Sequence, residues 1–93
     1  MYKVNDFLLF KTKQPHVHLN RMFGHNNLTY DDFDEEEYTG VVEGVLDGFG
    51  YTMTTLSPLE GFFCVISEYD IIRQLEPEEV AQLEKRSTLQ RHN

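Results

Sequence analysis

The fold is decided between residues 38 and 73, which read YTGVVEGVLDGFGYTMTTLSPLEGFFCVISEYDIIR. Residues 39–46 and 49–56 are rich in β-branched and aromatic side chains, and the pair Asp47-Gly48 lies between them. Asp-Gly is one of the best two-residue hairpin turns, because type I′ geometry needs a positive φ at both positions. This stretch therefore predicts a β-hairpin.

Three more strands are predicted around the hairpin. Residues 7–10, Phe-Leu-Leu-Phe, form an apolar run too short for a helix, which favours a strand that is buried on both faces or bent by a bulge. Residues 62–66 are typical of an apolar strand, residues 67–70 of a tight, 3₁₀-like turn, and residues 71–75 of a last short strand. The expected fold class is mainly β, with five strands.

The connection between the first strand and the hairpin lacks periodicity. Pro, Gly and Asn are frequent in it, so we expect an irregular loop over residues 12–37. Leu19, Met22 and Phe23 have helical spacing and predict one helical turn that docks the loop. Residues 28–30 predict a short strand.

A helix is expected at the C-terminal end. Pro77 lies between Glu76 and Glu78, and a proline in the first turn with acids beside it is typical of a helix N-terminus. We expect a helix over residues 77–88, followed by a frayed tail. The chain is then one β-unit over residues 1–75, with a helix and tail over residues 76–93.

This order of elements resembles the SH3-like small barrel, the superfold shared by SH3, Tudor and KOW-type domains. The likeness rests on VNDFLLF at 4–10, GVVEGV at 40–45, YTM at 51–53 and VISEYDII at 65–72. It implies a five-stranded SH3-like barrel with a long first loop and a C-terminal helix. The chain has no Trp and lacks the aromatic surface of peptide-binding SH3 domains, so recognition of proline-rich peptides is not expected.

The composition argues against two classes of partner, nucleic acids and anionic membranes. Sixteen acids against eight Lys and Arg give a net charge of -8, so direct binding to nucleic acid or to an anionic membrane is not expected. No apolar run approaches the ~20 residues that span a bilayer, and the N-terminus lacks the zones of a signal peptide. The single cysteine, Cys64, is expected to be a buried thiol, which favours a cytoplasmic protein.

An acidic run precedes the hairpin and is the candidate partner-binding site. Six acids in seven positions repel one another and favour a solvated surface, and two aromatic side chains interrupt and flank them. The charges would steer a basic partner, with help from Glu43 and Glu68, and the rings would anchor it. The alternative is that Phe33 packs under the loop and the acids form only a solvated rim. The candidate residues are Asp31, Asp32, Phe33, Asp34, Glu35, Glu36, Glu37 and Tyr38.

Three histidines form the only metal-like pattern. Alternate residues of an extended segment point the same way, so His16 and His18 could share an ion, with His25 as a third ligand. Solvated or hydrogen-bonded histidines are the alternative interpretation, and no metal or other cofactor is called for.

No catalytic signature is present. The acids lie in one hydrophilic run without a cleft that would split their pKa values, and no glycine-rich phosphate loop precedes a helix. We expect a protein that is not an enzyme and binds another protein, with a nucleic-acid-binding enzyme as one candidate partner.

Small acidic chains of this kind resemble bacteriophage accessory proteins, some of which inhibit host nucleic-acid enzymes by occupying a basic surface. A structural or assembly subunit and a histidine-loop metal-binding domain are the alternatives, and the oligomeric state is left open. We expect any site to lie before or after the hairpin, because residues 38–73 are explained by the fold.

Overall fold

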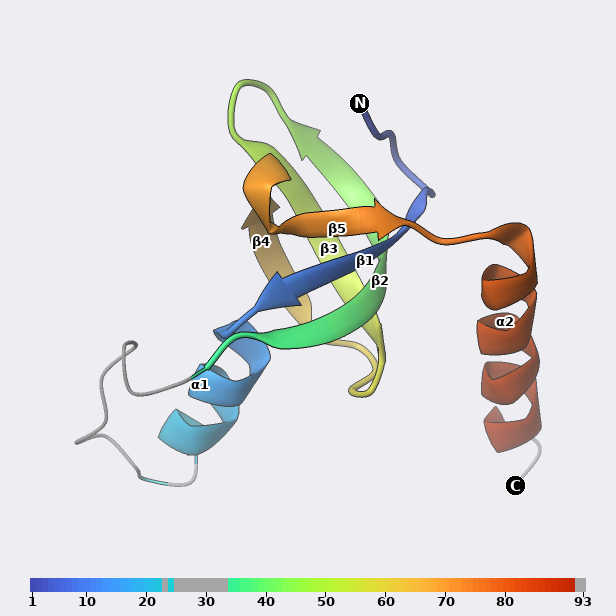
Figure 1. Cartoon of the computed structure of the whole chain (residues 1–93). Helices are drawn as coiled ribbons and strands as arrows, with labels where there is room; N and C mark the ends of the chain where they lie inside the picture. The colour runs from blue at the N-terminus through green and yellow to red at the C-terminus, as the bar shows by residue number, and fades with distance from the viewer. Residues whose placement is uncertain (23, 25–33, 92–93) are drawn as a thin grey trace.

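The computed structural model describes residues 1–22, 24 and 34–91 of the 93-residue chain. The architecture is mainly β, as predicted, with five antiparallel strands in one open sheet (Figure 1). The elements are β1 (Phe7–Thr12), α1 (Gln14–Met22), β2 (Glu36–Leu46), β3 (Gly50–Ser57), β4 (Phe63–Ser67), the 3₁₀ helix η2 (Glu68–Asp70), β5 (Ile71–Gln74) and α2 (Pro77–Arg91).

The strand order across the sheet is β4-β3-β2-β1-β5. The predicted hairpin is confirmed, since β2 and β3 pair directly and Leu46 faces Gly50 across the turn. The predicted type I′ geometry is wrong, because only Gly48 in the turn has a positive φ, of 75°. The Phe49 N–H donates to the Leu46 carbonyl at 3.0 Å, so the strands are joined by three residues instead of two.

Alternation along the strands builds the core. In β2 the side chains of Tyr38 and Val42 point inward, and in β3 those of Tyr51 and Met53 do the same. Among the described residues, the buried side chains that pack together as the hydrophobic core are Leu8, Phe10, Tyr38, Val42, Tyr51, Met53, Cys64 and Ile66. The predicted burial of Cys64 is confirmed, and burial raises the pKa of its thiol to about 11.

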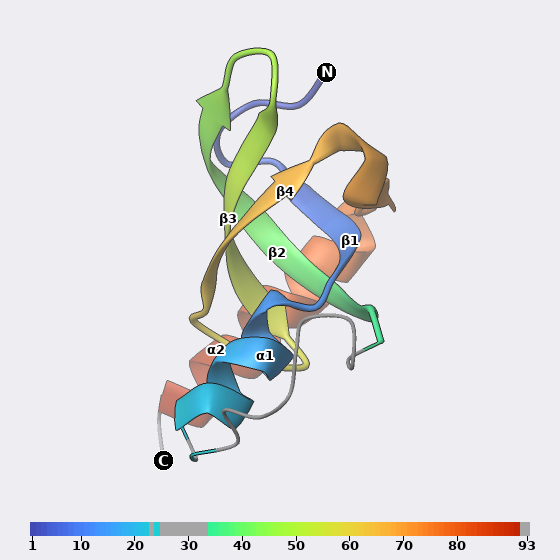
Figure 2. The same cartoon turned by 90° about the vertical axis from the view of Figure 1, so that its left-hand side faces the viewer.

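Irregular pairings bend the sheet. The register shifts twice between β2 and β3, at Thr39/Gly40 and at Val42/Gly44, and once between β1 and β5, at Leu9/Phe10. A bulge of this kind bends its strand and increases the local twist. Figure 2 shows the resulting twist, with β4 crossing the direction of β1 and β2.

Helix α1 corrects the prediction of an irregular loop over residues 12–37. The Thr12 hydroxyl accepts a hydrogen bond from the Gln14 N–H at 3.1 Å, and the Val17 N–H donates to the Lys13 carbonyl at 3.0 Å. Pro15 lies in the first turn, where a helix does not need its missing N–H, and it is fully buried together with Val17. The predicted strand over residues 28–30 lies outside the described residues.

The side chain of Gln14 fastens α1 to the outer edge of β4. Its carboxamide nitrogen donates to the Val65 carbonyl, and its carboxamide oxygen accepts from the Val65 N–H at 3.0 Å. This pair of hydrogen bonds satisfies the backbone of an edge strand in the way that a further strand would.

Helix α2 begins at Pro77, as predicted, and extends to Arg91 instead of ending at residue 88. It stands beside the sheet and is joined to it through the segment after β5 (Figure 1). Arg73 of β5 holds its first turn, because its two terminal nitrogens donate to the two carboxylate oxygens of Glu79 at 2.7 and 2.8 Å. No helix within the described ranges has the length and the apolar character needed to cross a membrane.

The close approach of β3 to β4 at Gly50 yields a test of the fold. A Cβ atom at this position would overlap the Ile66 carbonyl oxygen and lie 2.8 Å from the Ser67 Cα, both of which are backbone atoms. We expect Gly50→Ala to lower the free energy of unfolding by about 2–3 kcal/mol, measured by urea denaturation. Gly44→Ala is the control, because its Cβ would meet only the rotatable Thr52 hydroxyl; equal losses in the two variants would contradict the prediction.

The ion pair between β5 and α2 yields a test by titration. Hydrogen bonds from Arg73, and then from the Glu76 N–H, lower the pKa of Glu79 to about 2. A carboxylate with a lowered pKa stabilises the fold above its usual titration range, and this contribution is lost as the pH falls toward 2. This contribution to stability is small and is screened by salt, because both side chains of the ion pair are exposed.

We expect Arg73→Gln to raise the pKa of Glu79 toward its usual range in an NMR titration. Lys11→Gln, on a different part of the sheet, should leave it near 2. An unchanged pKa in Arg73→Gln would show that Arg73 is not the cause of the shift.

Candidate functional site

The described part of the acidic run, residues 34–37, is fully on the surface. Glu36 and Glu37 open β2, where they face Thr12 and Lys11 of β1. The run therefore does not lie wholly in a loop, because its last two residues are fixed by the hydrogen-bonded ladder of the sheet. Asp31, Asp32 and Phe33 lie outside the described residues.

Tyr38 does not belong to this surface. The alternation of β2 turns it into the core, where it is 1% exposed and its ring centroid lies 6.3 Å from that of Phe10. The expectation that its ring anchors a partner was therefore wrong. Its hydroxyl donates to the Glu36 carboxylate at 3.4 Å, so Tyr38 supports the acidic surface from beneath. Burial, and then the charge of Glu36, raise the pKa of Tyr38.

The two helper acids do not join the run. Glu43 is exposed on β2 six residues beyond Glu37, a separation of about 20 Å along an extended strand. Glu68 belongs to η2 and lies next to the β2–β3 turn. Among the described residues, Glu43 and Glu68 therefore lie on surfaces separate from residues 34–37.

The predicted histidine site assumed an extended segment, and the structure has a helix there instead. His16 and His18 belong to α1, and residues two apart on a helix do not share a face. The side chain of His18 is exposed, and its ring centroid lies 6.0 Å from that of Phe62 in an edge-to-face arrangement. Within the described residues no group of three or more His, Cys, Asp or Glu could hold a metal ion, and His25 lies outside them.

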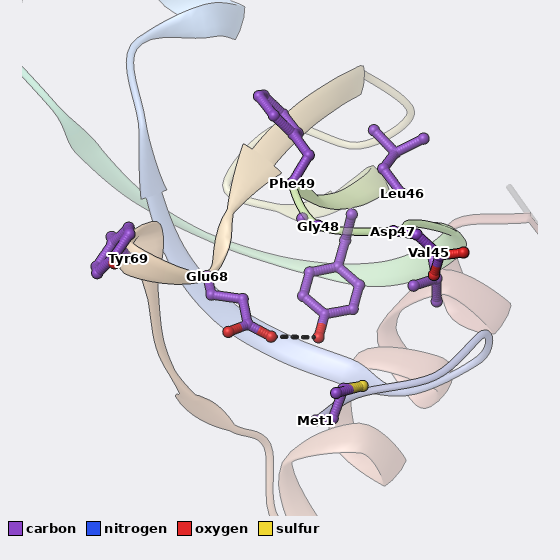
Figure 3. A pocket seen from close by; sticks show the side chains of 10 residues that line it. Met1, Val45, Leu46, Asp47, Gly48, Phe49, Glu68 and Tyr69 are labelled. Atoms are coloured by element: carbon purple, nitrogen blue, oxygen red, sulfur yellow. Dashed lines mark hydrogen bonds between the residues drawn. The ribbon is translucent and has the colours of Figure 1, made fainter.

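A second surface was not predicted from the sequence and lies at the tip of the β2–β3 hairpin. Val45, Leu46 and Phe49 are exposed there, with Phe49 at 62%, although apolar side chains of this size are normally buried. They line a hollow of about 430 Å³ with Glu68 and Tyr69 of η2, and we call it the hairpin-tip hollow (Figure 3). Exposed apolar patches often mark interaction sites.

The carboxylate of Glu68 is held in place inside this hollow. Tyr51 is buried in the core and also lines the hollow, and its hydroxyl donates to Glu68 Oε1 at 3.0 Å (Figure 3). The same hydroxyl accepts from the Tyr2 N–H at 3.1 Å, and the two tyrosine rings meet edge to face at 5.9 Å. In Figure 3 the Glu68 side chain points from η2 toward the hairpin, whereas Tyr69 points outward at the rim.

One signal in the sequence could have indicated this surface. Leu46 and Phe49 directly flank the Asp47-Gly48 pair, at a hairpin tip where polar residues are usual. We expected residues 38–73 to be explained by the fold alone, and the exposed apolar residues at this tip are not.

Comparisons with protein-family models, with curated proteins and with solved structures found no match to this chain.

Proposed function

We propose that this protein is a non-enzymatic, acidic protein-binding module that occupies a basic surface of its partner. The observation that carries the proposal is the row of four exposed acids at residues 34–37, half of it fixed on β2. Charges held on a strand need no ordering when a partner binds, which favours association. A basic nucleic-acid-binding groove is the surface that such a row would complement.

The finer assignment of the fold belongs to the same proposal. We assign the sheet to the SH3-like barrels, and two features support this. The first strand pairs with both the second and the last, and a 3₁₀ turn directly precedes the last strand. The small size and acidic balance favour a bacteriophage-type inhibitor of a host nucleic-acid enzyme.

A charge-matched pair of variants tests the role of the acidic row. Asp34→Asn, Glu35→Gln and Glu37→Gln together remove three charges and spare Glu36, which accepts the Tyr38 hydrogen bond. The control removes three charges elsewhere, with Glu43→Gln, Glu60→Gln and Glu78→Gln. Both variants have the same net charge, so any difference between them reports position.

The measurement uses partners captured from a host lysate by the wild-type chain and eluted with duplex DNA. We expect wild-type binding to such a partner to weaken steeply with salt. The acidic-row variant should bind at least about tenfold more weakly and the control nearly as well as wild type. Equal affinity of the two variants, or a captured partner that DNA does not displace, would contradict the proposal.

A second candidate function is assembly through α2. The specific observation is that α2 stands beside the sheet (Figure 1), where its apolar side chains Val80 and Leu83 are only half-buried. A helix that does not complete the core of its own sheet is available to join a neighbouring subunit.

Truncation separates the two functions. If α2 mediates assembly, light scattering at increasing concentration should show oligomers that removal of residues 76–93 abolishes, while binding through the acidic row persists. The far-ultraviolet circular dichroism of the truncated chain should retain the β signal. A wild-type chain that stays monomeric at every concentration would exclude self-assembly through α2.

A further inference from the structure

We infer that the hairpin-tip hollow is a second binding site, which accepts an arginine side chain from a partner protein. The inference uses residues separate from the acidic row, so it stands or falls independently of the function proposed above. It combines three observations: an exposed apolar wall, a carboxylate held in place, and an exposed aromatic ring in that wall.

The charge of the hollow selects a cation. Its acidic side chains are Asp47 at the turn and Glu68 on η2, and both are exposed. No Lys or Arg side chain lines the hollow, and in the part of the chain that the structure describes neither these side chains nor the α-amino group of Met1, which also lines it, forms an ion pair with either carboxylate. A cationic group from outside would therefore complement both acids.

The geometry favours a guanidinium over an ammonium. The Tyr51 hydroxyl engages only one oxygen of Glu68, Oε1, and so leaves Oε2 and the remaining lone pairs for a donor. A guanidinium is planar, presents paired N–H donors to a carboxylate and stacks on aromatic rings. Phe49, which is 62% exposed, supplies such a ring in the wall of the hollow.

The apolar wall indicates which kind of residue flanks the arginine in the partner. Val45 and Leu46 are exposed next to Phe49, and they would cover the aliphatic stem of the arginine and an adjacent apolar residue. The surface therefore fits a short segment in which an arginine is flanked by apolar side chains.

The hydrogen bond from Tyr51 orients the Glu68 carboxylate before a ligand binds. Without it, Glu68 would lose rotamer freedom on binding, whereas here the core already fixes one oxygen of its carboxylate. Tyr51 is thus a positioning residue, and Glu68 is the group that would meet the ligand.

The test uses the full chain and three short probe peptides, acetyl-Leu-Arg-Leu-amide and its lysine and citrulline analogues. Titration by ¹⁵N–¹H NMR should give saturable shifts at residues 45–50 and 68–69 with the arginine peptide. The lysine peptide should bind more weakly, and citrulline, which lacks the charge, should not bind.

Matched variants locate the site. Glu68→Gln retains an acceptor for Tyr51 and should weaken binding of the arginine peptide about tenfold or more. Phe49→Ala should also weaken it, while Phe63→Ala, which removes an equally exposed ring elsewhere, should not. The acidic-row variant should bind the peptide normally, so the two proposals can fail separately.

Three outcomes would overturn the inference: shifts spread evenly over the acidic surfaces, equal binding of the citrulline peptide, or full affinity in Glu68→Gln. A fourth outcome would identify a different ligand for the hollow. If light scattering shows dimers that Phe49→Ala abolishes, the hollow binds a second copy of this chain instead.

Discussion

The buried hydroxyl of Tyr51 is the constraint on which much of this structure depends. A tyrosine ring can complete the core only if its hydroxyl finds partners, since an unsatisfied buried polar group is costly. Here the hydroxyl bonds to the Tyr2 N–H and to Glu68, and so ties β3 to the N-terminal segment and to η2. This contact adds to the backbone pairing of Gly50 with Ser67, which places η2 against the hairpin.

Tyr38 plays a similar part at the other end of the sheet. Its ring lies in the same core and its hydroxyl donates to Glu36, the first residue of β2. Each of the two surfaces to which we assign binding thus has one carboxylate bonded to a tyrosine of the core. This arrangement joins surface carboxylates to the buried core, and it explains how a small domain can present fixed acids on its surface.

The edge strand β4 is protected by side chains. Gln14 satisfies the Val65 backbone and Asp70 accepts from the Ser67 N–H at 3.0 Å, so two successive outward-facing positions of this edge have partners. Such protection disfavours pairing with a strand of another chain. Binding through side-chain surfaces, as proposed for the acidic row and the hairpin-tip hollow, agrees with the protection of β4, one of the two edges of the sheet.

The sequence by itself determined the five strands, the 3₁₀ turn and the start of α2, because each depends on local periodicity or on turn and cap residues. It led to a wrong prediction for α1, where Pro15 was taken as a sign of irregular chain although a proline is favourable in a first helical turn. It also placed Tyr38 on the surface, because which face of a strand is buried depends on pairing with neighbours that a local pattern does not reveal.

Only the tertiary structure brought Glu68 to the hairpin tip, since the pairing of Gly50 with Ser67 joins positions that lie far apart in the chain. Contacts of that kind arise from long-range packing, so the sequence could indicate the apolar hairpin tip but not the hollow that Glu68 completes.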